Sequence, residues 1–419
     1  TPQKDGSGME VKPGYKQTEV GVIPEEWEVR TLGSLTTLLT NGFVGTATTA
    51  YVESEDGVLY IQGYNVQENG FNFHGIKRVS KAFHARNKKS CLQAGDLLTI
   101  QTGDIGVTTV VPPELVGANC HALIISRLRK QDSVAGYYCQ YFNSERGRVA
   151  FKEIETGTTM KHLNCGDMKR LFLPSPPVEE QRAIATALSD VDGLLGALDR
   201  FIAKKRDLKQ AAMQQLLPGQ TRLPGFHGEW EVKRLGEMAE IVMGQSPSSS
   251  NYNSTGVGLP LIQGNADIAN RKTIKRIFTT QITKRGKSGD ILMSVRAPVG
   301  EVSRAVFDVC LGRGVCAIRY DNDFMYHCLI YLEPTWAKHS KGSTFDSVNS
   351  ADVKALEVQL PTELPEQTAI AEVLTEMDGE LAALEQRREK TRALKQAMMQ
   401  ELLTGRTRLV SREAAKAKP

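Results

Sequence analysis

The short motifs that would carry catalysis are incomplete in this sequence. Gly286-Lys287-Ser288 resembles the end of a phosphate-binding P-loop, but Gln281 stands where the leading glycine belongs. Ser175-Pro176-Pro177-Val178 has the prolines of an adenine methyltransferase loop and lacks its polar first residue and its aromatic. Gly103-Asp104-Ile105-Gly106 has the wrong spacing for a dinucleotide-binding turn, and no His-Glu-x-x-His zinc motif occurs. The carboxylates of a nuclease follow no fixed spacing, so the sequence leaves open whether such a cluster is present. We expect no catalytic residues and no metal site.

Side chains that can hold or read DNA are more prominent. Arginine can pair with guanine and Gln or Asn with adenine, whereas Lys and Arg neutralise phosphates. In the first half of the chain the candidate contacts are Gln62, Asn65, Lys77, Arg78, Lys81, Lys88, Lys89, Gln101 and Thr102. In the second half they are Gln245, Gln263, Asn265, Arg271, Lys272, Lys275, Arg276 and Arg296. The basic clusters occupy corresponding places in two sequence repeats, which favours phosphate contacts over a merely solvated surface.

Composition limits the class of protein. The 419 residues are 40% hydrophobic and 24% charged, as in soluble globular proteins, and the net charge of +4 is low for a strong nucleic-acid binder. The seven cysteines contain no Cys-x-x-Cys pair, so we expect buried reduced thiols rather than zinc ligands or disulfides. No run of 18 apolar residues and no secretory signal occurs, which predicts a cytoplasmic protein.

The second half of the sequence repeats the first. Ala183-Ile184-Ala185 recurs as Ala369-Ile370-Ala371, an offset of 186 (369 − 183). About 25 of the 44 positions in residues 180–223 are identical to residues 366–409. The opening Glu26-Trp27-Glu28-Val29 also recurs at 229–232, whereas the segments between these anchors diverge. The repeat is too long for a solenoid, so the pattern indicates one scaffold that carries two different heads.

The repeated segments have the heptad spacing of coiled-coil helices. The first apolar seam consists of Ile184, Leu188, Val191, Leu195, Leu198 and Ile202. The second consists of Ile370, Leu374, Met377, Leu381 and Leu384. Arg388 interrupts the second seam, which should disturb the supercoil locally and resume near Leu394 and Met398. Each helix is preceded by prolines. The first ends at Pro218-Gly219 and the second at Gly405, so each has about 40 residues and a length of about 60 Å.

Two exposed apolar stripes of this length most simply cover each other. Packed antiparallel, the helices form a rod with a head at each end, and an approximate two-fold axis relates the halves. The Trp27 segment then meets the end of the second helix, and the Trp230 segment meets the end of the first. Two unrelated helical hairpins are the alternative.

The short apolar runs between glycines and asparagines predict α+β heads with a strongly curved sheet. The fold class is therefore α+β, with two α/β recognition domains joined by an antiparallel pair of long helices in a pseudo-two-fold repeat. The expected domains are a flexible segment at 1–20, a first head at 21–174, a central helix at 175–218, a second head at 219–361, a second helix at 362–405 and a flexible tail at 406–419.

Three segments resemble the specificity subunits of type I restriction–modification systems. Gly14-Tyr15-Lys16-Gln17-Thr18-Glu19-Val20-Gly21-Val22-Ile23-Pro24-Glu25-Glu26-Trp27 is similar to the opening of that family. Ser294-Val295-Arg296-Ala297-Pro298-Val299-Gly300 and the stretch from Gly342-Ser343-Thr344 to Pro361 are similar to parts of a second target-recognition domain. The repeated helices resemble the conserved regions of the family, and the resemblance extends from Gly14 to Leu409.

The resemblance implies a DNA-binding subunit of a host-defence complex that has no catalytic site or cofactor of its own. Each head would bind one half of a split site in double-stranded DNA, and the helices would set the spacer. Two modification subunits, which use S-adenosylmethionine, would methylate adenine. Restriction subunits, which use ATP and Mg²⁺, would translocate and cleave DNA.

Two questions stay open at the level of sequence. Helix faces away from the seam, including Arg200, Lys204, Lys205 and Arg206, either help dock the modification subunits or are plainly solvated. The competing functions are a coiled-coil assembly adaptor whose heads bind proteins and an autonomous DNA enzyme.

Overall fold

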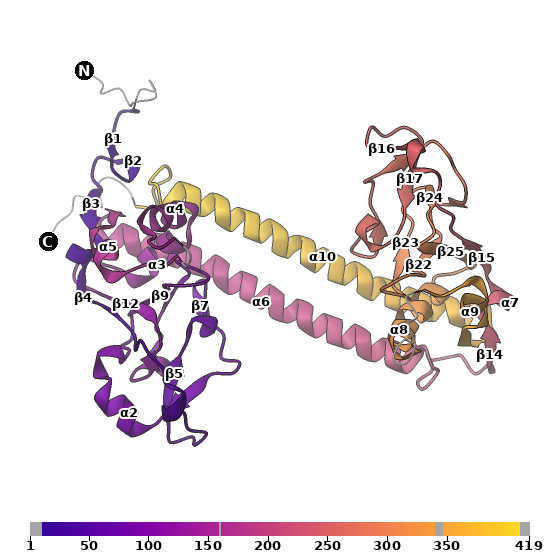
Figure 1. Ribbon diagram of the computed structural model, residues 1–419, viewed down its shortest axis with the longest axis horizontal. Helices are drawn as coiled ribbons and strands as arrows, with labels where there is room; N and C mark the ends of the chain where they lie inside the picture. Colours follow the sequence, from indigo (N-terminus) through magenta and orange to yellow (C-terminus); the bar gives the residue numbers. More distant parts are fainter. Residues whose placement is uncertain (1–10, 159–160, 340–346, 411–419) are drawn as a thin grey trace. The chain divides into compact units, whose positions relative to one another are not determined.

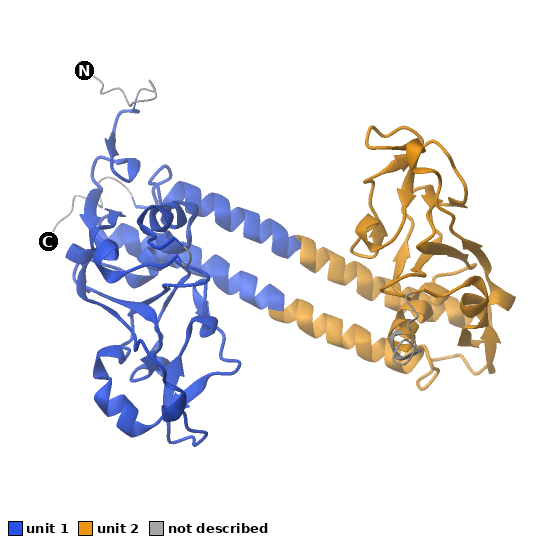
Figure 2. Ribbon diagram, viewed as in Figure 1, with its two compact units in different colours: residues 1–199, 387–419 blue, residues 200–386 orange. Residues whose placement is uncertain are grey.

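The chain forms two compact units that share its two longest helices. The structure, a computed structural model, describes residues 11–158, 161–339 and 347–410. The first unit comprises Thr1–Asp199 with Arg387–Pro419, and the second comprises Arg200–Gln386 (Figure 2). The Gly342-Ser343-Thr344 motif lies outside the described residues.

The two predicted long helices are present and nearly equal. Helix α6 spans Val178–Leu216 and α10 spans Leu364–Leu402, each with 39 residues (Figure 1). In the first unit Asp192 pairs with Lys395 at 2.6 Å, and in the second Lys209 pairs with Asp378. A second pair in each unit, Asp199 with Arg388 and Lys205 with Glu380, shows that residue numbers rise along one helix as they fall along the other. The helices therefore run antiparallel in each unit, as expected.

The seam is buried where both helices supply apolar residues. Ile184, Leu188, Ile370 and Leu374 are almost completely buried. The expectation that the second seam resumes near Leu394 and Met398 is confirmed for Met398, which packs against the core, and wrong for Leu394, which is 56% exposed. The heptad phase instead continues through positions 391, 395 and 398, which places polar residues in the seam and turns position 394 toward solvent.

The seam also corrects the interpretation of the basic residues on α6. Lys205 lies at a seam position and pairs with Glu380 of α10, and Arg206 pairs with Glu385. These two cations therefore link the helices to each other. Arg388, which interrupts the apolar pattern, pairs with Asp199 at 3.3 Å, and α10 remains continuous through it.

Each head combines a sheet next to the long helices with a second, outer sheet. In the first unit the inner sheet has the order β10-β9-β12-β4 and the outer sheet β11-β5-β8. The strands are β4 (Thr36–Asn41), β5 (Val58–Ile61), β8 (Lys77–Val79), β9 (Leu97–Ile100), β10 (Thr108–Val110), β11 (Asn119–Cys120) and β12 (Leu123–Leu128). The helices of this head are α1 (Leu32–Leu35), α2 (Lys81–Arg86), α3 (Ala135–Asn143), α4 (Glu145–Ile154) and α5 (Cys165–Arg170).

The second head repeats this topology although its sequence differs. The order β15-β25-β22-β23 matches the inner sheet, and the neighbours β20-β17-β24 match the outer sheet. The strands are β15 (Glu240–Met243), β17 (Leu259–Ile262), β20 (Phe278–Thr279), β21 (Arg285–Gly286), β22 (Ile291–Ser294), β23 (Val302–Arg304), β24 (Val309–Leu311) and β25 (Val315–Arg319). The helices are α7 (Leu235–Met238), α8 (Phe324–His339) and α9 (Ser350–Ala355).

The α+β class is thus confirmed, but the single curved sheet expected for each head is divided into two, as the first head shows. The chain leaves the outer sheet after β11 and enters the inner sheet at β12, with Ala122 between them at a φ of 46°. This left-handed backbone turns the chain sharply between the two hydrogen-bonding directions.

Both faces of the inner sheet are buried, which explains its continuous apolar strands. On β12, Ile124 faces a core that includes Ile184 and Leu188 of α6, whereas Leu123 and Ile125 face a core beneath the outer sheet. On β25, Cys316 and the two residues beside it alternate in the same way between two cores.

A buried carboxylate closes each unit. Glu180 at the start of α6 is completely buried, accepts a hydrogen bond from Trp27 Nε1 at 2.9 Å and pairs with Arg408 at 2.7 Å. Its repeat equivalent Glu366 is also buried and pairs with Arg222 at 2.6 Å. The predicted meeting of each tryptophan segment with the end of the opposite helix is confirmed: Trp27 packs with Leu402, and Gly219 approaches the Trp230 ring.

The chain is ordered within part of the N-terminal segment for which we expected flexibility. Strand β1 (Tyr15–Thr18) pairs with β2 (Gly21–Pro24), and the Tyr15 hydroxyl donates to the Gly405 carbonyl at 3.0 Å. Residues 1–10 and 411–419 lie outside the described residues. Within the described ranges, no helix has the length and apolar character needed to cross a membrane.

A second polar contact ties each head to the long helices. In the first unit Gln140 on α3 donates to Asp192 at 2.7 Å. In the second unit His327 on α8 occupies the corresponding place, with Nδ1 4.0 Å from Asp378 and Nε2 3.0 Å from Thr375. Burial lowers the pKa of His327 to about 4, against the opposing effect of Asp378. The imidazole is therefore neutral near pH 7. Both units thus have an uncharged side chain at this position, His327 in the second and Gln140 in the first.

The His327 environment predicts an acid-sensitive second unit. Below about pH 6.5 the unfolded chain binds a proton that the folded imidazole excludes until the pH falls to about 4. Stability is therefore full above pH 6.5 and falls as the pH decreases through this window, by about 2 kcal/mol at pH 5. His327→Gln should remove this loss, measured by denaturant unfolding monitored through tryptophan fluorescence at pH 7 and pH 5. The reverse change, Gln140→His, should introduce it in the first unit; an unchanged pH dependence in His327→Gln would contradict the assignment.

Candidate nucleic-acid interface

The two heads place Gln62 and Gln263 at equivalent turns, directly after the central strand of each outer sheet. Gln62 N donates to Asn65 Oδ1 at 3.0 Å, and Gln263 N donates to Asp267 Oδ2 at 2.8 Å. Both glutamine side chains are half-buried and each donates to a tyrosine hydroxyl, of Tyr64 and Tyr252 respectively. Sequence-predicted amides therefore occupy the same structural position in both heads.

Asn65 is not part of an exposed surface, which corrects its prediction as a DNA contact. The residue is completely buried in the 3₁₀ turn Gly63–Asn65. Its Oδ1 accepts from Gln62 N, and its Nδ2 donates to the Asn72 carbonyl at 2.9 Å. The amide thus holds the turn together and has no free edge for a base. Asn265, in the corresponding turn Asn265–Asp267, is half-buried.

The basic residues of the first head gather around the outer sheet and α2, at the end of the unit away from α6 and α10 (Figure 1). Lys77, Lys81, Lys88 and Lys89 are exposed, and no ion pair joins them to the residues that the structure describes. Arg78 is half-buried and donates to the Gly57 carbonyl at 2.8 Å. The four lysines are free to neutralise phosphates.

The basic residues of the second head divide into paired and free cations. Arg271 forms two hydrogen bonds with Glu333, which raise its pKa, and Arg276 pairs with Asp267 at 2.9 Å. Lys272 and Lys275 are exposed, and no ion pair joins them to the described residues. Within the described residues, these two lysines are therefore the cations of this group that are left free of an ion pair.

The two basic clusters correspond only in part. Lys81, Lys88 and Lys89 follow strand β8, as Lys284, Arg285 and Lys287 follow its counterpart β20. Arg271, Lys272, Lys275 and Arg276 instead precede β20. The first two lie on the hairpin formed by β18 (Ile268–Ala269) and β19 (Lys272–Thr273), and the other two follow it. The counterpart of this hairpin in the first head is β6 (Val66–Gln67) with β7 (Gly70–Phe71), which carries no lysine or arginine.

The remaining predicted contacts lie at the inner sheets rather than on the outer turns. Gln101 and Thr102 follow β9, and Arg296 follows the equivalent strand β22. Thr102 and Arg296 are exposed at matching positions, whereas Gln101 is half-buried. Gln245, which follows β15, is exposed.

Sequence reasoning missed two aromatic residues on the same turns, because it searched for amides and cations. Tyr64 is 51% exposed and Phe73 is 53% exposed, beside the candidates Gln62 and Lys77. The Tyr64 hydroxyl donates to the Gly75 carbonyl at 2.8 Å. Burial and the neighbouring Tyr51 raise the pKa of Tyr64, so its hydroxyl stays neutral. No periodicity signals such residues, since each stands alone in a loop.

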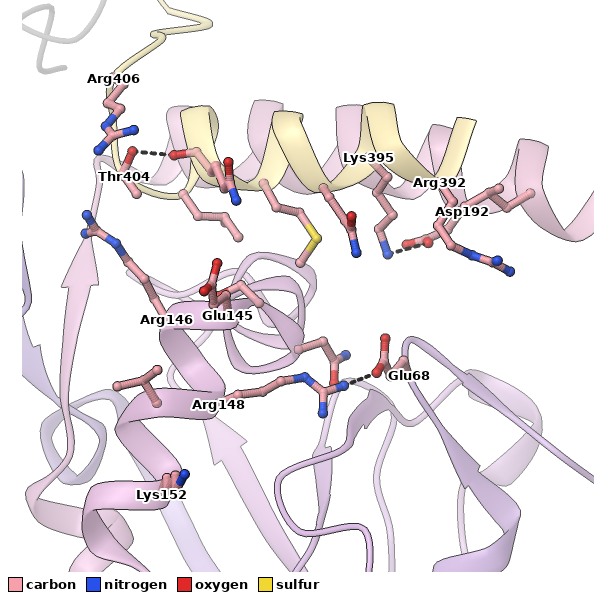
Figure 3. Close-up of a pocket in the computed structure, with 18 residues that line it drawn as sticks. Glu68, Glu145, Arg146, Arg148, Lys152, Asp192, Arg392, Lys395, Thr404 and Arg406 are labelled. Atoms are coloured by element: carbon pink, nitrogen blue, oxygen red, sulfur yellow. Dashed lines mark hydrogen bonds and ion pairs between the residues drawn. The ribbon is translucent and has the colours of Figure 1, made fainter. Parts of the chain in front are cut away.

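A groove in the first unit runs between α4 and the second half of α10 (Figure 3). Arg148 with Glu68 lies on the head side, and Lys395 with Asp192 on the helix side. The cavity of about 1110 Å³ is lined largely by charged residues, whereas small-molecule sites are mostly apolar with few polar groups. The groove therefore resembles a protein-facing surface more than a cofactor site.

The P-loop-like segment does not form a strand–loop–helix turn. Lys287 of the P-loop-like segment lies in a turn between β21 and β22, where its amide donates to Asp290, and no helix follows. Within the described ranges, no group of three or more His, Cys, Asp or Glu side chains is placed to hold a metal ion. All seven cysteines are free thiols, five of them buried and Cys91 and Cys165 half-buried.

Comparison with known proteins identifies relatives over nearly the whole chain. A family model described as the type I restriction modification DNA specificity domain matches residues 24–202 and 227–393. A putative type I restriction enzyme specificity subunit, MjaX, of Methanocaldococcus jannaschii is 30% identical, with 94% of this chain and 97% of that protein covered. The MjaVIII specificity subunit of the same organism is 22% identical, with 92% and 94% covered.

Solved structures share the fold. The S subunit of a type I restriction–modification system from M. genitalium matches with a TM-score of 0.62 and 17% identity, covering 90% of this chain and 96% of that one. A chain from a structure of type I restriction–modification complex assembly matches with a TM-score of 0.58 and 24% identity, covering 92% and 99%.

The free lysines of the first head predict a measurable salt effect. Each phosphate contact contributes about −0.9 to the slope of log affinity for duplex DNA against log salt concentration. Replacing Lys81, Lys88 and Lys89 together by alanine should weaken binding and reduce the magnitude of the slope by up to about 2.7 (3 × 0.9). Fluorescence anisotropy at several salt concentrations gives both quantities. Lys390→Ala, which removes an exposed lysine of α10, is the matched control; equal slopes for the two variants would contradict the predicted interface.

Proposed function

The chain belongs to the type I restriction modification DNA specificity family, and we propose that each of its heads binds one half of a split DNA site. The repeated topology of the heads carries this proposal. The equivalent turns share a glutamine, Gln62 and Gln263, whereas the equivalent strand ends differ, with Thr102 in one head and Arg296 in the other, as reading two different half-sites requires. The alternative of a coiled-coil assembly adaptor is not favoured by the family match.

The modification subunits are the expected partners, and we propose that one docks on each unit. The repeat is identical at exposed helix positions as well as in the seam. Leu208 in the second unit is 48% exposed, and its equivalent Leu394 in the first unit is 56% exposed. Packing in the seam explains why buried residues are repeated, but it does not explain why an exposed leucine is repeated together with its neighbours. Such a repeat is expected if two copies of one partner bind the two equivalent surfaces.

Catalysis and its cofactors are assigned to the partners. S-adenosylmethionine would be bound by the modification subunits, and ATP and Mg²⁺ by restriction subunits. This chain would supply the DNA sequence at which adenine is methylated or from which cleavage is directed.

Mapping adenine methylation in the host genome tests the proposal directly. Cells with an intact gene should carry N6-methyladenine at one asymmetric, two-part sequence, and cells without it should lose methylation at that sequence only. Re-expression of the chain is the control that restores it. Methylation that does not change on deletion would reject the proposed function.

The length of the helix pair should determine the spacer between the two half-sites. Seven residues inserted after Asp199 and seven after Gln386, where the two units divide, keep the heptad phase in both helices. Each insertion adds about 10.5 Å, which corresponds to about three base pairs at 3.4 Å each. The methylated site should therefore gain about three unread base pairs while its half-sites stay the same. An insertion in α6 alone breaks the pairing of the helices and serves as the control; an unchanged spacer in the double insertion would refute this role.

A further inference from the structure

The turn after the central outer strand is braced in the same way in both heads. Asn72 N donates to the Asn65 carbonyl at 2.8 Å, and Ile274 N donates to the Asp267 carbonyl at 2.9 Å. Val66 pairs with Phe71 in the first hairpin as Ile268 pairs with Thr273 in the second. These contacts make Asn72 the structural equivalent of Ile274, and consequently Phe73 the equivalent of Lys275.

The two equivalent positions are both exposed, but one carries an apolar aromatic ring and the other a positive charge. Phe73 is 53% exposed and stacks on Phe71 with ring centroids 5.9 Å apart. Lys275 is also exposed, and its ammonium lies 5.1 Å from the Phe307 ring centroid. One loop scaffold thus presents an aromatic ring in the first head and a cation in the second.

Hydrogen bonds hold the aromatic loop of the first head before any ligand is bound. Besides the contacts of Asn65 and Tyr64, His74 N donates to Asn72 Oδ1 at 3.0 Å, and Gly75 adopts a φ of 68° that favours glycine. Phe73 stacks on Phe71 and the Tyr64 hydroxyl donates to the Gly75 carbonyl, yet about half of each side chain remains in water, where apolar surface is unfavourable. A surface arranged in this way fits an apolar partner.

We propose that Phe73, with Tyr64, packs against the bases of the half-site bound by the first head, whereas Lys275 contacts a phosphate of the other half-site. This inference rests on the proposed function and deepens it by assigning different recognition chemistry to one position of the repeat. The exposed Lys77 lies four residues after Phe73 and leads into Lys81, Lys88 and Lys89. These cations bring the DNA backbone to the loop, and an aromatic ring can contact a base edge in the groove, such as a thymine methyl group, without involving the phosphate charge.

A pair of equivalent substitutions separates the two kinds of contact. The probes are a duplex with the site found by methylation mapping and a second duplex with the first half-site scrambled, bound by the chain together with its modification subunits. Phe73→Ala should weaken binding to the intact site about 10-fold, with the salt slope unchanged, and should have little effect on the scrambled duplex. Lys275→Ala should weaken binding to both duplexes and reduce the magnitude of the salt slope by about 0.9.

Two further variants make the test decisive. Phe73→Lys, which introduces the residue of the second head, should increase the magnitude of the slope by about 0.9 and reduce the preference for the intact half-site. Phe172→Ala removes an aromatic that is 45% exposed elsewhere in the first unit, and it should bind like the wild type. Equal losses of Phe73→Ala on both duplexes, or a changed slope, would overturn the inference while leaving the proposed function intact. A wild-type complex without preference for the mapped site would overturn both.

Discussion

A carboxylate without solvent contact at the start of each long helix is the constraint on which both units depend. Removing Glu180 or Glu366 from water is unfavourable unless a cation and hydrogen bonds compensate. Arg408 and Arg222 supply the cation, and each comes from the chain just after the end of the opposite helix. The ion pair therefore specifies which helix end meets which helix start. Packing of the tryptophan segment over this pair then fixes the head against the helices.

The heads show how one backbone arrangement accommodates two dissimilar sequences. Strand pairing in the inner sheets is the same, and in both heads alternate residues of the central strands face two different cores. These strands need only be apolar on both faces. Ile124-Ile125 in the first head and Ala317-Ile318 in the second meet this requirement with different side chains. Surface turns carry no such demand, so they are free to differ. Divergence concentrates where a ligand would be contacted, and similarity where the units are closed.

Much of this arrangement was predictable from sequence because repetition and heptad spacing report directly on helices. The antiparallel pairing and the meeting of Trp27 with the end of α10 follow from burying two apolar stripes. Leu394 was predicted wrongly because apolar character was weighed above heptad phase, which places Thr391 and Lys395 in the seam. Asn65 looks like a DNA contact in sequence, yet its polar atoms hold a turn together, and Arg276 pairs with Asp267 while its side chain stays 48% exposed. Such partners lie across loops, and sequence spacing alone does not identify them.

The distribution of the two units along the chain has a consequence for synthesis. The second unit is one continuous stretch, Arg200–Gln386, and all its packing partners have been translated once residue 386 is made. The first unit needs Leu402, Leu403 and Arg408, which are translated about 200 residues after its own helix start. At a translation rate of about 5–20 residues per second, Arg408 is synthesised on the order of 10–40 s after Glu180. Until then the apolar side chains that pack on Leu402 and Leu403 lack these partners, so the second unit can complete its packing before the first.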